Sequence, residues 1–221
     1  AARVMAGESL RSIGFTREVA LRHVAVKEAV LPFARFPGCD VRLTPEMRST
    51  GEVMGLDLDS GMAFIKSQQA AGNPIPRSGG VFVSVSGERA SDRTEMVTCA
   101  RELAAMGYAI WATCGTATLL RDSGVPARAA FAISEGRPNA LDLMRDGDAG
   151  WIINVPSGCQ PQLDEVKMRT EAVRRGVPMT TTLRGLRAAI DGLQTLAAHP
   201  EVEVLTLQEY HRATIRKGNP S

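Results

Sequence analysis

The chain has 221 residues, of which 44% are hydrophobic and 23% are charged. This length exceeds one average domain and falls short of two, so it predicts one large domain or a small domain with a companion piece. The 26 Lys and Arg residues nearly balance the 24 Asp and Glu residues, and the net charge is only +2. This composition excludes a collagen, a disordered acidic tail and a coiled-coil rod, and the interleaved charges do not support nucleic acid as a partner.

The sequence carries neither a membrane span nor an evident metal site. Its longest apolar runs, at 81–85 and 109–112, are too short to cross a bilayer, so no membrane partner is expected. The amino terminus lacks both Met and a continuous apolar run, which indicates a piece of a longer chain rather than a signal peptide. The 4 cysteines lie far apart and only 3 histidines accompany them. Neither a disulfide framework nor a metal site is expected, and the default setting is a reduced, cytoplasmic one.

The first 72 residues predict few regular elements. They contain a short helix over 1–5, a strand over 23–31 that Pro32 stops, and a helix over 60–71. Residues 33–55 are dense in Pro, Gly, Ser and Thr and predict a loop. Because this part has too little apolar periodicity for a core of its own, we expect it to be the tail of a domain whose body lies upstream. Two Pro and three Gly between positions 71 and 80 predict a linker at 73–80.

From residue 81 onward, predicted strands and helices alternate. The strands are expected at 81–85, 108–112, 129–133, 151–154 and 178–182. The helices are expected from Asp92 to Gly107, at 117–122, near Leu141, at 163–175 and at 186–197, with Asp92 and Glu95 forming a capping box on the first. Such alternation predicts βαβ units and a parallel sheet. Residues 81–221 are therefore predicted to be a Rossmann-like α/β domain with helices on both faces of the sheet.

Ligands of open α/β sheets bind beyond the carboxyl ends of the strands, where four loops of this chain meet. These loops are 86–93, 113–116, 135–139 and 154–158. The second of them begins a helix and offers two hydroxyls and free backbone N–H groups to an anion. Taken singly, each loop has a plainer interpretation: Arg93 and Arg137 as solvated charges, Cys114 as a small buried side chain, and Asn154 as a partner of its own loop. Their expected convergence at one sheet edge favours a binding site.

Motifs that would indicate catalysis are absent. The sequence has no phosphate-binding P-loop, no Gly-x-Gly-x-x-Gly run, no His-Glu-x-x-His and no Gly-x-Ser-x-Gly. All three histidines (His23, His199 and His211) lie outside the candidate loops. A general acid or base there would have to be Glu135 or Asp92. The pattern therefore favours a binding domain over a catalytic one, and no catalytic residue is assigned.

Several motifs, in order and spacing, resemble the carboxyl-terminal end of the large chain of carbamoyl-phosphate synthase. The most specific is PEMRSTGEVMG at 45–55. The others are PF at 32–33, FPG at 36–38, ATCGT at 112–116, EGRP at 135–138, IN at 153–154 and SG at 157–158. The resemblance implies that residues 1–72 close the second ATP-grasp synthetase unit. It also implies that residues 81–221 form an allosteric domain similar to methylglyoxal synthase.

The resemblance further implies a function and partners. The complete enzyme would make carbamoyl phosphate from bicarbonate, glutamine-derived ammonia and two ATP, with Mg and K, for pyrimidine and arginine synthesis. Its partners would be a glutaminase small chain and the upstream ATP-grasp domains, and UMP or IMP would bind the regulatory domain. The fragment itself is expected to need no cofactor and to be non-catalytic.

The family motifs carry site residues over to this chain. The nucleotide phosphate is expected on Thr113, Gly115, Thr116 and Arg93, and Ser84 and Asn154 are expected to line the same pocket. Glu28 and Thr181 match contacts of ornithine, a second effector of bacterial members.

Three departures from the family pattern leave the preferred effector open. Met179 replaces a Tyr, Ala132 replaces a Lys, and Asn154-Val155-Pro156 replaces an Asn-Thr-Thr or Asn-Thr-Pro run.

One alternative function is a lyase like methylglyoxal synthase acting on a phosphorylated triose, although no histidine is expected at the pocket. A second alternative is an interaction module that only docks on a partner.

Overall fold

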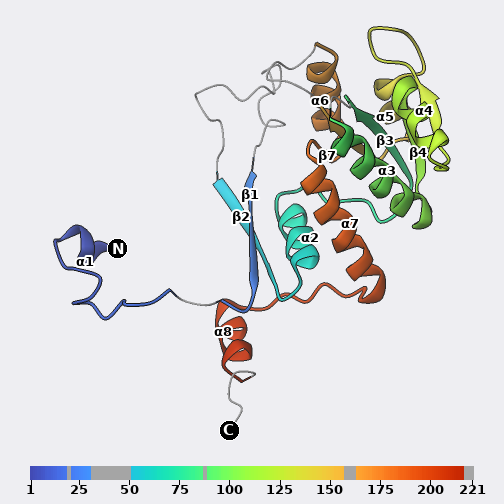
Figure 1. Cartoon of the computed structure of the whole chain (residues 1–221). Helices are drawn as coiled ribbons and strands as arrows, with labels where there is room; N and C mark the ends of the chain where they lie inside the picture. Colours follow the sequence, from blue (N-terminus) through green and yellow to red (C-terminus); the bar gives the residue numbers. More distant parts are fainter. Residues whose placement is uncertain (19–20, 31–50, 87–88, 157–162, 217–221) are drawn as a thin grey trace.

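The computed structural model describes residues 1–18, 21–30, 51–86, 89–156 and 163–216 (Figure 1). After the short helix α1 (Ala2–Met5), strands β1 (Val24–Val30) and β2 (Gly51–Asp57) pair antiparallel. Helix α2 (Ser60–Ala70) packs on this pair. We call β1, β2 and α2 the N-terminal unit.

Strand β2 corrects the prediction of a loop over residues 33–55. Its residues Gly51 to Gly55 lie in the strand, while 31–50 lie outside the described residues. Glycine suggested a loop, yet Gly55 serves close packing here. A Cβ atom at Gly55 would lie 2.0 Å from the backbone oxygen of Ala63 on α2. A glycine within a strand commonly marks such a close approach of another backbone.

The remaining strands form one parallel sheet in the order β5-β4-β3-β6-β7. They are β3 (Gly80–Val85), β4 (Ala109–Thr113), β5 (Arg128–Ala130), β6 (Trp151–Val155) and β7 (Met179–Thr180). The strands predicted at 129–133 and 178–182 are thus shorter than expected. Phe131 makes only an isolated bridge to Asn139.

Helices cover both faces of this sheet, which confirms the predicted fold class. They are α3 (Ala90–Ala105), α4 (Cys114–Asp122), α5 (Ala140–Asp146), α6 (Leu163–Arg175) and α7 (Leu183–Ala198). Val81, Val83 and Ile153 point into one core with α3, α4 and α7. Phe82 and Ile152, the alternate residues, point into a second core with α5 and α6. This alternation follows from the two-residue period of a strand.

Two helix predictions need correction. Helix α3 begins at Ala90 with Arg89 as its N-cap, so Asp92 lies in the first turn and does not cap it. A carboxylate in the first turn still interacts favourably with the helix dipole, which explains why the capping pattern was misleading.

Helix α8 (Leu207–Arg216) was not predicted. It lies beside the N-terminal unit, where Tyr210 donates a hydrogen bond of 2.5 Å to the Leu56 carbonyl oxygen and accepts one from Lys66 (Figure 1).

The N-terminal unit is packed against the sheet domain through α2 and α7 (Figure 1). The two helices cross where Gly61 meets Gly192, so closely that a Cβ atom on Gly61 would lie 2.5 Å from the Gly192 nitrogen. Ile75 of the predicted linker packs beside this crossing, and Tyr108 holds the next residue through a hydrogen bond of 2.5 Å to the Pro76 carbonyl oxygen. Gly80 already belongs to β3. The domain boundaries at 72 and 80 remain predictions.

Candidate functional site

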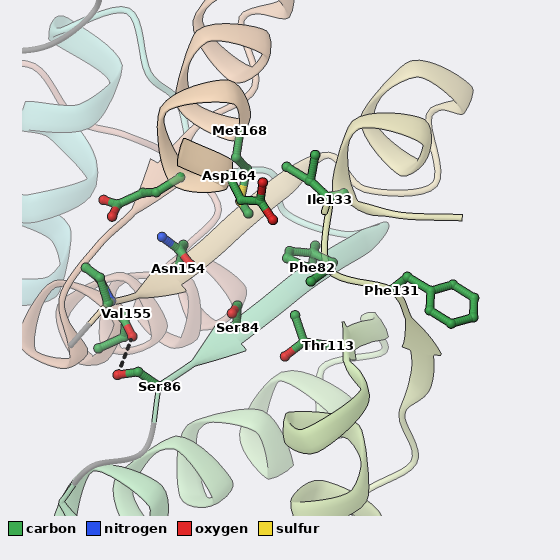
Figure 2. A pocket seen from close by; sticks show the side chains of 14 residues that line it. Phe82, Ser84, Ser86, Thr113, Phe131, Ile133, Asn154, Val155, Asp164 and Met168 are labelled. Carbon is green, nitrogen blue, oxygen red and sulfur yellow. Dashed lines mark hydrogen bonds between the residues drawn. The ribbon is translucent and has the colours of Figure 1, made fainter. Parts of the chain in front are cut away.

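A cavity of about 240 Å³ opens at the carboxyl ends of the parallel strands (Figure 2). We call it the strand-end pocket. Ser84 of β3, Thr113 of β4 and Asn154 of β6 line it, together with the segment after β5 and the first turns of α6. Its other lining residues are Phe82, Ser86, Phe131, Ala132, Ile133, Ala140, Val155, Pro156, Asp164, Glu165 and Met168. Described residues of the predicted loops 86–93, 113–116 and 154–158 therefore meet at this edge, as expected. The expectation for loop 135–139 is wrong: its residues line a different cavity, because Arg137 and Asn139 are held by the Asp142 carboxylate of α5.

A second cavity, of about 290 Å³, adjoins the first and shares Ser86 and Thr113 with it. We call it the Arg93 pocket. Arg93, Thr113, Gly115 and Thr116 all line it. The structure thus brings together the four residues predicted to meet a phosphate. Ser84 and Asn154 line only the strand-end pocket, so the six predicted nucleotide residues are divided between two connected spaces.

Arg93 supplies the positive charge of its pocket. It is exposed on α3, and no ion pair or hydrogen bond engages its side chain within the described part of the chain. Gly115 lies in the first turn of α4, and an ideal Cβ atom there would meet nothing within 4 Å. The first N–H groups of a helix lack partners within the helix and carry a partial positive charge. The pocket therefore combines a guanidinium with a helix amino terminus, a combination that suits an anion.

Thr116 has a structural contact that sequence reasoning did not foresee. Its side chain is only 4% exposed. The hydroxyl oxygen accepts hydrogen bonds from the Thr113 hydroxyl at 3.0 Å and from the Val85 N–H at 3.3 Å. These contacts fix the start of α4 against the end of β3. A role of Thr116 in binding phosphate remains a prediction.

Asn154 lines the strand-end pocket. It is 7% exposed, and its side-chain amide makes no hydrogen bond to any other residue that the structure describes. The plainer interpretation, in which Asn154 bonds its own loop, is thus not supported by the described residues; 157–158 lie outside them. A nearly buried amide without partners is costly unless water or a ligand satisfies it. Asn154 is therefore suited to bind a polar group in the cavity.

Two carboxylates at the start of α6 also line the strand-end pocket, and sequence reasoning missed both. Oδ2 of Asp164 accepts hydrogen bonds from the Ser134 N–H at 2.8 Å and the Ser134 hydroxyl at 2.6 Å. Glu165 is 9% exposed and is paired with Arg169 at 2.8 Å. The available signal was two acidic residues opening the helix that follows β6.

The residues that had been considered as acid or base lie elsewhere. Neither Glu135 nor Asp92 lines the strand-end pocket or the Arg93 pocket. Cys114, interpreted as a small buried side chain, is exposed. It is the first residue of α4, and its thiol lies 3.6 Å from the Ala130 carbonyl oxygen of β5.

The two predicted ornithine residues lie away from both pockets. Glu28 is on β1 and accepts a hydrogen bond of 3.0 Å from the Gln68 side chain on α2. Thr181 follows β7 and precedes Thr182, the N-cap of α7. Among the described residues, no hydrogen bond joins Glu28 to Thr181. Their shared role remains a prediction.

The described ranges contain neither a metal-binding cluster nor a helix that could span a membrane. No group of three or more His, Cys, Asp or Glu side chains there could hold a metal ion. None of the helices in these ranges is long and apolar enough to span a bilayer.

Comparison with known proteins identifies relatives of the chain. Residues 95–181 match the MGS-like domain family. The carbamoyl phosphate synthase large chain of Myxococcus xanthus is 45% identical over 210 residues, which cover 95% of this chain and 19% of the relative. The corresponding Synechocystis protein is 44% identical over 213 residues, with the same coverage of the two chains. The arginine-specific chloroplastic large chain of Oryza sativa subsp. japonica is 43% identical over 220 residues, 99% of this chain and 18% of that protein.

These matches confirm the resemblance stated from the sequence motifs. The chain spans about a fifth of the length of the curated relatives that it matches. The α/β sheet with helices on both faces agrees with the MGS-like domain that its sequence matches. Residues 95–181 thus resemble MGS-like domains, and the chain is similar, over nearly all of its length, to part of the carbamoyl phosphate synthase large chains.

Proposed function

We propose that this chain is the effector-binding part of a carbamoyl phosphate synthase large chain and that its ligand is a nucleoside monophosphate of the UMP or IMP type. The observation that carries the proposal is the pair of connected pockets that share Ser86 and Thr113. One pocket has a cation and a helix amino terminus, and the other has uncharged polar groups, apolar walls and carboxylates. A ligand with one anionic end and one neutral end matches this division.

In the proposed complex, the phosphate lies in the Arg93 pocket. The planar guanidinium of Arg93 can donate two parallel hydrogen bonds to phosphate oxygens, and the N–H groups at the start of α4 add further donors. The nucleoside then extends past Thr113 into the strand-end pocket. There the side-chain amide of Asn154 can form hydrogen bonds with the ligand, and Phe82 and Met168 supply apolar contacts. Asp164 can accept a hydrogen bond from a ligand hydroxyl.

The wider activity follows as a proposal from the relatives. Synthesis of carbamoyl phosphate would require the upstream ATP-grasp domains and a glutaminase small chain, and the N-terminal unit would close the second synthetase unit. Ornithine would act near Glu28 and Thr181. Because phosphoryl transfer depends on metals and positioned cations, we expect no ATP hydrolysis by this chain alone.

The lyase alternative has one point in its favour, the Asp164 and Glu165 carboxylates in the strand-end pocket. Both are committed to protein partners, Asp164 to Ser134 and Glu165 to Arg169. No histidine lines the pocket among the residues that the structure describes. The arrangement supports binding better than proton transfer. Release of methylglyoxal from dihydroxyacetone phosphate by the purified chain would favour the lyase instead.

Calorimetric titration with UMP, IMP and ornithine tests the proposed function. We expect Arg93→Ala to weaken monophosphate binding by about ten- to hundredfold, because it removes charge-assisted hydrogen bonds. The loss should shrink in high salt, which screens the charge. Arg184→Ala is the matched control, because Arg184 is exposed on α7 and has no ion pair within the described residues. If neither nucleotide binds the unmodified chain, or if both variants bind as it does, the proposal is wrong.

A further inference from the structure

The charges of the two pockets are opposite. Of the described residues that line the Arg93 pocket, the charged one is Arg93. Among those that line the strand-end pocket, none is Lys or Arg, while Asp164 and Glu165 are acidic. Ala132, which also lines the strand-end pocket, brings no charge to it.

Asp164 contributes the uncompensated charge. Glu165 is paired with Arg169, so its charge is largely balanced. Both hydrogen bonds of Asp164 come from Ser134, a neutral residue, and both reach Oδ2. Oδ1 has no hydrogen-bond partner among the described residues. Figure 2 shows Asp164 across the pocket from Thr113, the residue shared with the Arg93 pocket.

We propose that Asp164 makes this site selective for ligands with a single anionic end, so that nucleoside 3′,5′-bisphosphates and bisphosphorylated sugars are rejected. The inference rests on the proposed function, which places the 5′-phosphate on Arg93 and the sugar towards the strand-end pocket. A second phosphate at the other end of the sugar would lie in or near the strand-end pocket, where it meets the Asp164 carboxylate and no lining cation. Like charges a few ångströms apart in a partly solvated site repel enough to change an affinity by about tenfold or more. Asp164 is thus a specificity-determining residue, while a neutral nucleoside is tolerated and can donate to Oδ1.

The test compares UMP with uridine 3′,5′-bisphosphate, and IMP with inosine 3′,5′-bisphosphate, on the whole chain in buffer containing EDTA, so that metal ions do not mask the extra phosphate. We expect the unmodified chain to bind each monophosphate at least about tenfold more tightly than its bisphosphate. Asp164→Asn keeps the shape of the side chain and one oxygen that can accept the hydrogen bonds from Ser134, but it removes the negative charge. It should reduce the ratio of the two affinities to less than about threefold, mainly by tighter binding of the bisphosphate. Asp122→Asn is the control, since it makes the same change at an exposed position of α4 outside both pockets.

The possible outcomes separate this inference from the proposed function. If monophosphates bind but 3′,5′-bisphosphates bind equally well, or if Asp164→Asn leaves the ratio unchanged, the charge selectivity is wrong and the nucleotide site stands. If no nucleotide binds the unmodified chain, the proposed function falls and the selectivity falls with it. High salt provides a second measurement: it should narrow the ratio for the unmodified chain and leave that of Asp164→Asn nearly constant.

Discussion

The contact between Gly61 and Gly192 offers the sharpest test of how the N-terminal unit is attached to the sheet domain. A Cβ atom at Gly192 would lie 2.4 Å from Cγ1 of Ile65 and 2.5 Å from the Gly61 oxygen. A Cβ atom at Gly61 would lie 2.5, 2.7 and 2.8 Å from three backbone atoms of α7. Side chains can shift by rotation, whereas two helix backbones must move apart. Gly61→Ala should therefore be the more damaging substitution.

The expected change in the free energy of unfolding has two opposing parts. Alanine in a helix interior is favoured over glycine by about 1 kcal/mol. Overpacking costs about 1–3 kcal/mol, and more where backbone must move. We expect a net destabilisation of about 1 kcal/mol for Gly192→Ala and about 2–3 kcal/mol for Gly61→Ala. For a chain of this size, each kcal/mol lowers Tm by about 2–4 °C.

Thermal and urea unfolding followed by circular dichroism measure these changes. Gly115→Ala is the matched control, because Gly115 is also helical and has open space where the new Cβ atom would lie. It should leave the free energy of unfolding unchanged or raise it by up to about 1 kcal/mol. If Gly61→Ala proves as stable as the unmodified chain, or if Gly115→Ala loses more stability, the close helix contact does not hold the two units together.

Two further predictions concern the carboxyl-terminal helix and acid stability. Tyr210→Phe removes the hydroxyl that bonds the Leu56 carbonyl oxygen and Lys66. Hydrogen exchange of the backbone amides in α8 and β2, measured by mass spectrometry, should therefore accelerate by about five- to thirtyfold. Amide exchange in β3 and β6 should stay unchanged. The hydrogen bond from Arg174 lowers the pKa of Glu171 to about 2, against an opposing effect of burial and with help from Arg175. Since the folded pKa lies below the ordinary value of 4.5, Glu171 contributes stability above about pH 4.5, and this contribution is lost as the pH falls towards 2. Glu171→Gln should therefore show a shallower fall of urea midpoint between pH 4.5 and 2, and an unchanged slope would contradict this assignment.

The sheet domain was predictable because its central strands are buried on both faces. Such strands appear in the sequence as short, continuous apolar runs, as at Val81 to Val83 and Trp151 to Ile153. Strand β2 was not predictable in this way, since its glycines resemble a loop until the backbone of α2 is seen against Gly55. The register of such a strand depends on a neighbour that local sequence does not reveal. The same holds for α8. Of its described side chains, Tyr210 is the buried one, and it bonds a strand residue 154 positions earlier in the chain.

The site was predictable where it depends on the first residues after a strand. Arg93, Thr113, Gly115 and Thr116 meet because parallel strands end at the same sheet edge. Asp164 and Glu165, in the first turn of α6, were missed because they reach the pocket only through the position of α6 relative to the sheet. The contacts of the Thr116 hydroxyl with Val85 and Thr113 could not be predicted from the sequence, because they depend on how α4 is placed against β3.

If the proposed function is right, the attachment of the N-terminal unit offers a route by which a bound nucleotide would act on the neighbouring synthetase domain. Helix α7 starts directly after β7, at the sheet edge where ligands of α/β domains bind, and it crosses α2 at Gly192. Since the two backbones touch there, α7 cannot shift across its contact without moving α2. Gln68 of α2 in turn holds the Glu28 carboxylate on β1. A ligand that displaced α7 would therefore change the position of Glu28, and the rigid glycine contact, rather than a flexible linker, would carry the displacement.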